Sequence, residues 1–204
     1  APELQPQIVE DKTHALEEGL RSGNLEVAVL GGSVDSTTFD SIELYDEEFV
    51  LVVPHDSPLA GRTDLALSEI AGENILLLDD GHCLRDQIVE LCTLAEVRRT
   101  PGAQSVTRAA SLTTIVQLVV VGLGTTLVPL SAVAAECARP GLAVATFADG
   151  VDAKRTVGLV MRASSRRRSE YEQLGELVAR LLLWGVFVVV DAFDVSANFA
   201  AAAP

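Results

Sequence analysis

The chain has 204 residues, of which 49% are hydrophobic, and its formal net charge is −14. A chain of this length and composition can bury a sizeable core, in one lobe or two, and gives no sign of disorder. The acidic balance argues against direct nucleic-acid binding, because phosphate contacts require clustered Lys and Arg. The sequence carries neither a secretory signal nor a membrane-length apolar run, so we expect a cytoplasmic protein without membrane contact.

The first third of the sequence predicts a strand, a helix and a second strand. Ile8-Val9 predicts the first strand, and a helix with Leu16 and Leu20 on one face follows and ends near Gly23. Leu25–Leu30 predicts the next strand. Thr13 precedes the apolar helix face, which is the usual place for a helix-entry cap.

The next segment predicts two short strands around an acidic turn. The apolar stretches Ile42–Tyr45 and Phe49–Val53 flank Asp46-Glu47-Glu48, which we expect to be a solvated turn. Leu65–Ile70 predicts a short helix, and Ile75–Leu78 predicts a strand.

A strand, a tight turn and a helix meet at His82-Cys83. Two acids and Gly81 follow the apolar run, after which apolar residues recur at helical spacing at positions 84, 88, 91 and 95. Cys83 therefore lies in the first helical turn, where free N–H groups and the helix dipole favour a thiolate, and His82 and Arg85 add donors or positive charge. We expect a cysteine of low pKa.

Cys92 lies nine positions after Cys83 in the same predicted helix. At about 100° and 1.5 Å per residue, the two side chains lie on opposite faces and ~13.5 Å apart along the axis. A disulfide requires Cα atoms within about 7 Å, so a Cys83–Cys92 bond forms only if the helix opens. The alternative is that both cysteines are simple packing residues.

The second half of the sequence continues the alternation of helices and strands. Ser111 predicts the N-cap of a helix that ends before Gly122, and strands are predicted at Thr125–Val128, Leu142–Phe147 and Arg155–Met161. A small-residue helix is predicted over Ala132–Cys137, with Cys137 in a packing role. A last helix carries Tyr171, Leu174 and Leu177 on one face.

The segment from Gly81 to Gln87, followed by Cys92, resembles the redox segment of the OxyR-type, peroxide-sensing LysR transcriptional regulators. Further similar segments lie at Thr13-His14, Ser111-Leu112-Thr113, Gly122-Leu123-Gly124, Leu127-Val128-Pro129 and Arg155–Val160. The resemblance extends from about Pro6 to about Leu181. The apolar run Leu181–Val190 and the Ala-rich end depart from it. They are candidates for capping a lobe, for oligomer contacts or for the product of an altered reading frame.

The resemblance implies an α/β fold of two Rossmann-like lobes joined by two crossover strands, as in type 2 periplasmic binding proteins. We expect lobe I to comprise residues 1–48 and 154–204, and lobe II residues 49–153. The family's winged helix-turn-helix domain and the first strand and helix of its effector domain have no counterpart in this sequence, so Ile8-Val9 matches the family's second strand. Strands alternating with helices support the α/β class independently.

The resemblance also implies roles for individual residues. Cys83 is expected to react with hydrogen peroxide as a thiolate and Cys92 to resolve the product into a disulfide. The expected peroxide-binding residues are Thr13, His82, Gln87 and Arg155, and Arg85 belongs to the thiolate environment. We expect no metal and no cofactor.

Three functions remain open at this point. The favoured one is a peroxide-sensing regulatory domain rather than an enzyme, activating oxidative-stress genes as a homodimer or homotetramer. It would reach promoter DNA and RNA polymerase only through the full-length protein, and a thiol reductant would reset it. The alternatives are a LysR-type effector domain that binds a small metabolite, in which Ser111 contacts the ligand, and a thiol peroxidase-like enzyme.

Overall fold

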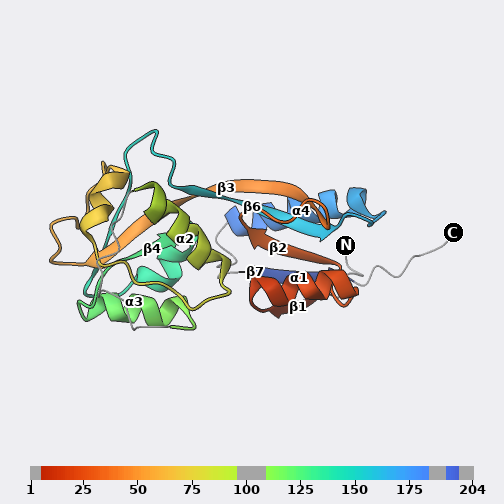
Figure 1. Ribbon diagram of the computed structural model, residues 1–204, viewed down its shortest axis with the longest axis horizontal. Coiled ribbons are helices and arrows are strands. Elements are labelled where there is room, and N and C mark those ends of the chain that lie inside the picture. Colours follow the sequence, from red (N-terminus) through yellow and green to blue (C-terminus); the bar gives the residue numbers. More distant parts are fainter. Residues whose placement is uncertain (1–5, 96–108, 184–191, 198–204) are drawn as a thin grey trace. The chain divides into compact units, whose positions relative to one another are not determined.

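The computed structural model describes residues 6–95, 109–183 and 192–197 (Figure 1). The described chain divides into two compact units. Unit 1 contains the residues up to Tyr45 and from Thr156 onward, and unit 2 contains Asp46–Arg155. Both units combine strands with helices.

The sheet of unit 1 has the order β1 (Pro6–Glu10), β7 (Ala192–Ala197), β2 (Val27–Gly31) and β6 (Lys154–Arg162), followed by β3 (Phe39–Pro54). β7 is antiparallel to both β1 and β2, and β2 is antiparallel to β6. The predicted first strand and helix are therefore present, but β1 reaches β2 only through β7 (Figure 1).

Two helices cover opposite faces of β2, because alternate side chains of a strand point to opposite sides. α1 (Thr13–Ser22) packs Leu16 and Leu20 against Ala28 and Leu30. On the other face, a second apolar cluster joins β2 and β6 to α4 (Arg168–Leu183); its members are Val27, Val29, Val157, Leu159, Met161, Tyr171 and Leu174. α1 ends at Gly23, whose φ of 82° lies in the left-handed region that glycine tolerates.

Unit 2 is built around the second half of β3. This segment pairs in antiparallel fashion with β4 (Thr126–Pro129) on one side and β5 (Leu142–Ala145) on the other, so residues 50–53 are completely buried. Around it lie η1 (Leu67–Gly72), α2 (Cys83–Leu94), α3 (Leu112–Val120), η2 (Leu130–Ala132) and η3 (Val133–Cys137). The helix predicted over Leu65–Ile70 is present as the 3-10 helix η1, and the helix predicted over Ala132–Cys137 is present as the short π-helix η3. The η2 segment is also a 3-10 helix.

The predicted acidic turn at Asp46–Glu48 is wrong, because β3 continues through it from Phe39 to Pro54. Asp46 and Glu48 are exposed, while Glu47 points inward and is buried. The local sequence suggested a turn because acidic residues are uncommon in strands. The partners of Glu47, the Arg155 guanidinium and the Ser131 N–H, are distant in sequence.

Ile75–Leu78 forms isolated parallel bridges rather than the predicted strand, with Ile75 opposite Thr125 and Leu78 opposite Ala109. The C-terminal tail also differs from expectation, since residues 192–197 form β7 inside the sheet of unit 1. Residues 184–190 of the predicted apolar run lie outside the described part. Within the described ranges, no helix is both long and apolar enough to cross a membrane.

Candidate functional site

The turn before α2 is fixed by backbone hydrogen bonds to two other segments of unit 2. The Leu76 N–H donates to the Thr125 carbonyl at 2.7 Å, and the Asp79 N–H donates to the Ala109 carbonyl at 3.0 Å. Gly124 permits this close approach, because a Cβ there would lie 2.4 Å from the Asn74 carbonyl oxygen. These contacts determine where the helix begins.

His82 and Cys83 form the start of α2. Gly81 has a φ of 94°, which a side chain would strain, and it turns the chain so that His82 occupies the N-cap position and Cys83 the first helical position. Both residues are buried. The N-terminal location of Cys83 is as predicted, and the unpaired N–H groups of a first turn favour a thiolate there.

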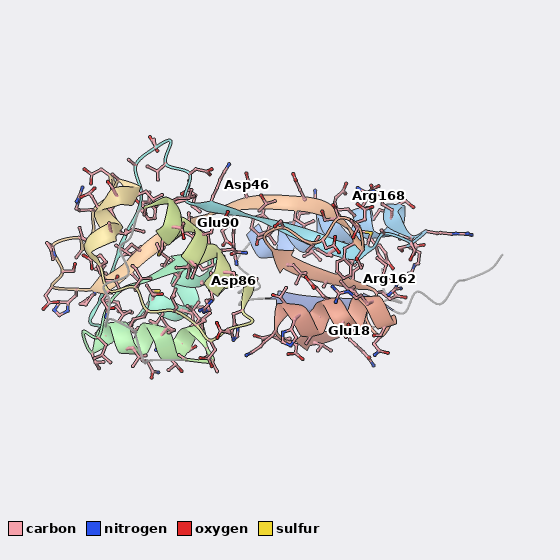
Figure 2. The ribbon with its side chains drawn as sticks, in the orientation of Figure 1. Glu18, Asp46, Asp86, Glu90, Arg162 and Arg168 are labelled. Atoms are coloured by element: carbon pink, nitrogen blue, oxygen red, sulfur yellow. The ribbon has the colours of Figure 1, made fainter. Side chains whose placement is uncertain are left out.

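Arg85 lies in the first turn of α2 and pairs with two carboxylates. Its Nη2 lies 2.9 Å from Asp80 Oδ1, and its Nη1 lies 3.4 Å from Asp86 Oδ1. Asp86 and Glu90 lie on the exposed side of α2 (Figure 2). The positive charge of Arg85 is therefore partly offset by its neighbours, and its role in the thiolate environment stays a prediction.

Gln87 lies one turn beyond Cys83, so the two side chains share one stripe of α2. Its Oε1 atom is buried and has no hydrogen-bond partner among the described residues. A buried amide oxygen without a partner is unfavourable, unless a small polar ligand supplies a donor. Gln87 therefore has the chemistry expected of a residue that binds peroxide.

Cys92 lies near the other end of the same unbroken helix and is half-buried. The helix is regular from Cys83 to Leu94, so its two cysteines lie on opposite faces, about 13.5 Å apart along the axis. The residues predicted to face the core are all buried: Leu84, Ile88 and Leu91 within α2, and Ala95 at its C-cap. None of the three cysteines is in a disulfide in this structure.

Arg155 lies on β6 and forms a buried ion pair with Glu47. Arg155 Nε donates to Glu47 Oε2 at 2.9 Å, and Nη2 lies 2.9 Å from the same oxygen. Sequence reasoning selected Arg155 but missed Glu47. One signal could have revealed Glu47. If the acidic segment is treated as a strand, its side chains alternate between the exposed and the inward face, and Glu47 falls on the face opposite to Asp46 and Glu48.

Thr13 lies in unit 1 as the first residue of α1, and the cap position belongs to Lys12, so the predicted capping role of Thr13 is wrong. Its Oγ1 is buried and has no hydrogen-bond partner within the described residues. The other predicted site residues, His82, Cys83, Arg85, Gln87, Cys92 and Arg155, all belong to unit 2.

Two other sequence candidates have structural roles. Ser111 is the N-cap of α3, where its side chain accepts a hydrogen bond from the Thr114 N–H, as predicted. Cys137 is buried, and burial together with the neighbouring Glu136 carboxylate raises its pKa to about 11. In the described part of the chain, no three His, Cys, Asp or Glu side chains are grouped so that they could hold a metal ion.

A family model described as the LysR substrate binding domain matches residues 1–182. The chain belongs to this family. The predicted α/β fold of the type 2 periplasmic-binding kind is confirmed by that match and by solved structures of LysR-type regulatory domains. Strand β7 lies beyond the matched residues.

Curated relatives carry names related to peroxide response. The chain is 42% identical over 181 residues to a probable hydrogen peroxide-inducible genes activator of Mycobacterium avium, and 38% identical over 179 residues to the DNA-binding transcriptional dual regulator OxyR of Escherichia coli. These alignments cover 89% and 87% of this chain. The chain spans 57% and 56% of the length of those relatives.

Solved structures support the same family. An H2O2-bound cysteine-to-serine mutant of Corynebacterium glutamicum OxyR is 48% identical, with a TM-score of 0.86 over 91% of this chain and 57% of that one. The oxidized form of C. glutamicum OxyR gives a TM-score of 0.76 at 50% identity, with the same coverage. A structure described as the reduced form of OxyR is 37% identical, with a TM-score of 0.71 over 88% of this chain and 81% of that one.

Proposed function

We propose that this chain is the hydrogen peroxide-sensing regulatory domain of a LysR-type transcriptional regulator, switched by a reversible Cys83–Cys92 disulfide. The observation that carries the proposal is the placement of two thiols on opposite faces of α2, with Cys83 buried at the N-terminus beside His82. The names of the relatives support peroxide as the signal.

The reaction consumes one peroxide and two thiols. The Cys83 thiolate attacks one peroxide oxygen, the O–O bond breaks, and the leaving hydroxide takes a proton to become water, which leaves Cys83 as sulfenic acid. The Cys92 thiolate then attacks the Cys83 sulfur, the S–O bond breaks, and the leaving hydroxide takes a proton to become a second water; the two protons used are those that the two thiols lost on ionising. The sulfur atoms lose two electrons in total and the peroxide gains them.

Four residues are the proposed peroxide-binding groups: Thr13, His82, Gln87 and Arg155. Gln87 Oε1 has a free lone pair for a peroxide O–H, and a cationic Arg155 is suited to stabilise the leaving oxygen, where negative charge develops. Thr13 is a candidate through the family resemblance and through its buried hydroxyl.

The intact α2 matches what the reduced state requires, because the disulfide cannot form within a regular helix.

The proposed output is a change in subunit pairing. Homodimer formation, promoter binding through a separate DNA-binding domain, and resetting by a thiol reductant are part of the proposal, as is a cytoplasmic location. Exposed apolar side chains at the end of α3, on Val120, Val121 and Leu123, offer a surface for a second subunit. We propose that the domain regulates and does not turn over substrate as a peroxidase would.

The experiment is thiol titration and disulfide mapping after brief exposure to sub-stoichiometric hydrogen peroxide. We expect one Cys83–Cys92 bond per peroxide consumed and an unmodified Cys137. Cys83→Ser should abolish fast consumption, Cys92→Ser should stop at sulfenic acid, and Cys137→Ser is the matched control. If Cys83→Ser consumed hydrogen peroxide at the parental rate, the proposal would be overturned. If the parental chain consumed many equivalents of peroxide in the presence of excess reductant, a thiol peroxidase would be favoured.

A further inference from the structure

Glu47 is a buried carboxylate without a role in the peroxide reaction proposed above. Along β3 its neighbours Asp46 and Glu48 are exposed, whereas Glu47 is only 6% exposed. Asp46 forms an ordinary surface ion pair with Lys154, in which both side chains are about half exposed. The single inward-facing acid of this segment is therefore distinct from its neighbours, and a buried carboxylate requires compensation.

Both oxygens of Glu47 have partners within unit 2. Oε2 receives Arg155 Nε at 2.9 Å and lies 2.9 Å from Nη2, while Oε1 accepts the backbone N–H of Ser131 at 2.9 Å. Ser131 belongs to η2, directly after β4, so the carboxylate joins three segments of this unit. Its own orientation is fixed by a backbone donor that does not depend on side-chain rotation.

The guanidinium of Arg155 is held from two directions. Its Nε donates a hydrogen bond to Glu47, with Nη2 2.9 Å from the same carboxylate oxygen, and the ring of Phe49 lies with its centroid 6.0 Å from Cζ. A planar guanidinium fixed on one edge by a carboxylate and on one face by an aromatic ring has little rotational freedom. Nη2 is buried and makes no hydrogen bond with the described residues, so this held guanidinium keeps a donor that a small ligand could use.

We infer that Glu47 is the positioning residue that holds Arg155 for the peroxide step. This inference rests on the proposed function, since it assigns Glu47 an effect only through Arg155. A donor that is already oriented when charge develops on the leaving oxygen stabilises that charge without reorganising. Glu47 thus sets the rate at which Cys83 is oxidised, although it touches neither the thiol nor the peroxide.

The test measures the rate of Cys83–Cys92 bond formation in the full chain after mixing with hydrogen peroxide. Glu47→Gln keeps the side-chain shape but removes the charge that holds Arg155, and we expect the rate to fall about tenfold or more. Glu48→Gln makes the same charge change one residue away on the exposed face, and it should leave the rate unchanged. Glu47→Asp, which keeps the charge, should give an intermediate rate.

A double-mutant cycle separates positioning from a general structural effect. In an Arg155→Gln background, Glu47→Gln should slow the reaction no further, because its effect passes through Arg155. Thermal unfolding of each variant shows whether it is folded. If Glu47→Gln does not fold, the oxidation rate of Glu47→Asp alone tests the inference. A parental rate in the folded Glu47 variants, or slowing that persists without Arg155, would overturn the inference. A parental chain that forms no disulfide would instead overturn the proposed function.

Discussion

Cys83 and Cys92 lie on one regular helix, on opposite faces, with three core side chains of α2 between them. A bond between the two sulfurs therefore requires the helix to lose backbone hydrogen bonds and the buried contacts of Leu84, Ile88 and Leu91. Exposure of a few such side chains is of order several kcal/mol. The disulfide should be more oxidising than a structural one, as a resettable sensor requires.

The redox potential should respond to the packing of α2. Ile88→Ala removes core contacts that exist only while the helix is intact, at a loss of about 2–4 kcal/mol to the reduced state. The oxidised state loses little, so the potential of the Cys83–Cys92 couple should become more negative by about 40–80 mV. Titration against glutathione measures this shift.

Leu94→Ala is the matched control for that experiment, because Leu94 is on the same helix but 65% exposed. The redox potential of the Cys83–Cys92 couple in this variant should equal that of the parental chain within error. An Ile88→Ala potential that is unchanged, or less negative, would mean that the helix does not open on oxidation.

Cys137 should react only at high pH. Burial raises the pKa of its thiol from 9.0 to about 11, so the nucleophilic thiolate is scarce below that pH and increases as the pH rises through it. At pH 8, iodoacetamide should modify Cys137 much more slowly than Cys83, and the difference should vanish in urea. Mass-spectrometric mapping of alkylated cysteines follows both sites, and equal rates in the folded chain would contradict the buried environment.

Strand β7 should stabilise unit 1. Among the described strands it alone pairs with β1, and it also pairs with β2. A chain that ends after Leu183 should have a Tm lower by several degrees, and its β1 amides should exchange faster. A chain that ends after Asn198 retains β7 and serves as the control. Equal Tm values and equal β1 protection in the two truncated chains would show that β7 is dispensable.

The features that were predictable from the sequence are those with local signals. The core face of α2, the Ser111 cap and the Gly23 terminus of α1 follow from helical spacing and from the chemistry of helix ends, which a few neighbouring residues determine. The placement of Cys83 at a helix start followed in the same way.

The features that were missed depend on partners distant in the chain. Glu47 and Arg155 are separated by 108 positions, so nothing in the acidic segment itself reveals that one of its acids is buried. Ile75–Leu78 has the composition of a strand, but its neighbours meet it only at isolated bridges. β7 pairs with strands from the other end of the chain, a register that no local pattern encodes.

The central claim is that peroxide joins Cys83 to Cys92 by opening α2. Hydrogen exchange, followed by mass spectrometry on the reduced chain and on the same chain after one equivalent of peroxide, tests it most directly. We predict that amides from Leu84 to Leu91 are protected in the reduced chain and exchange quickly, or with a new pattern, once the disulfide is mapped. A confirmed Cys83–Cys92 bond with unchanged protection across those amides would contradict the mechanism.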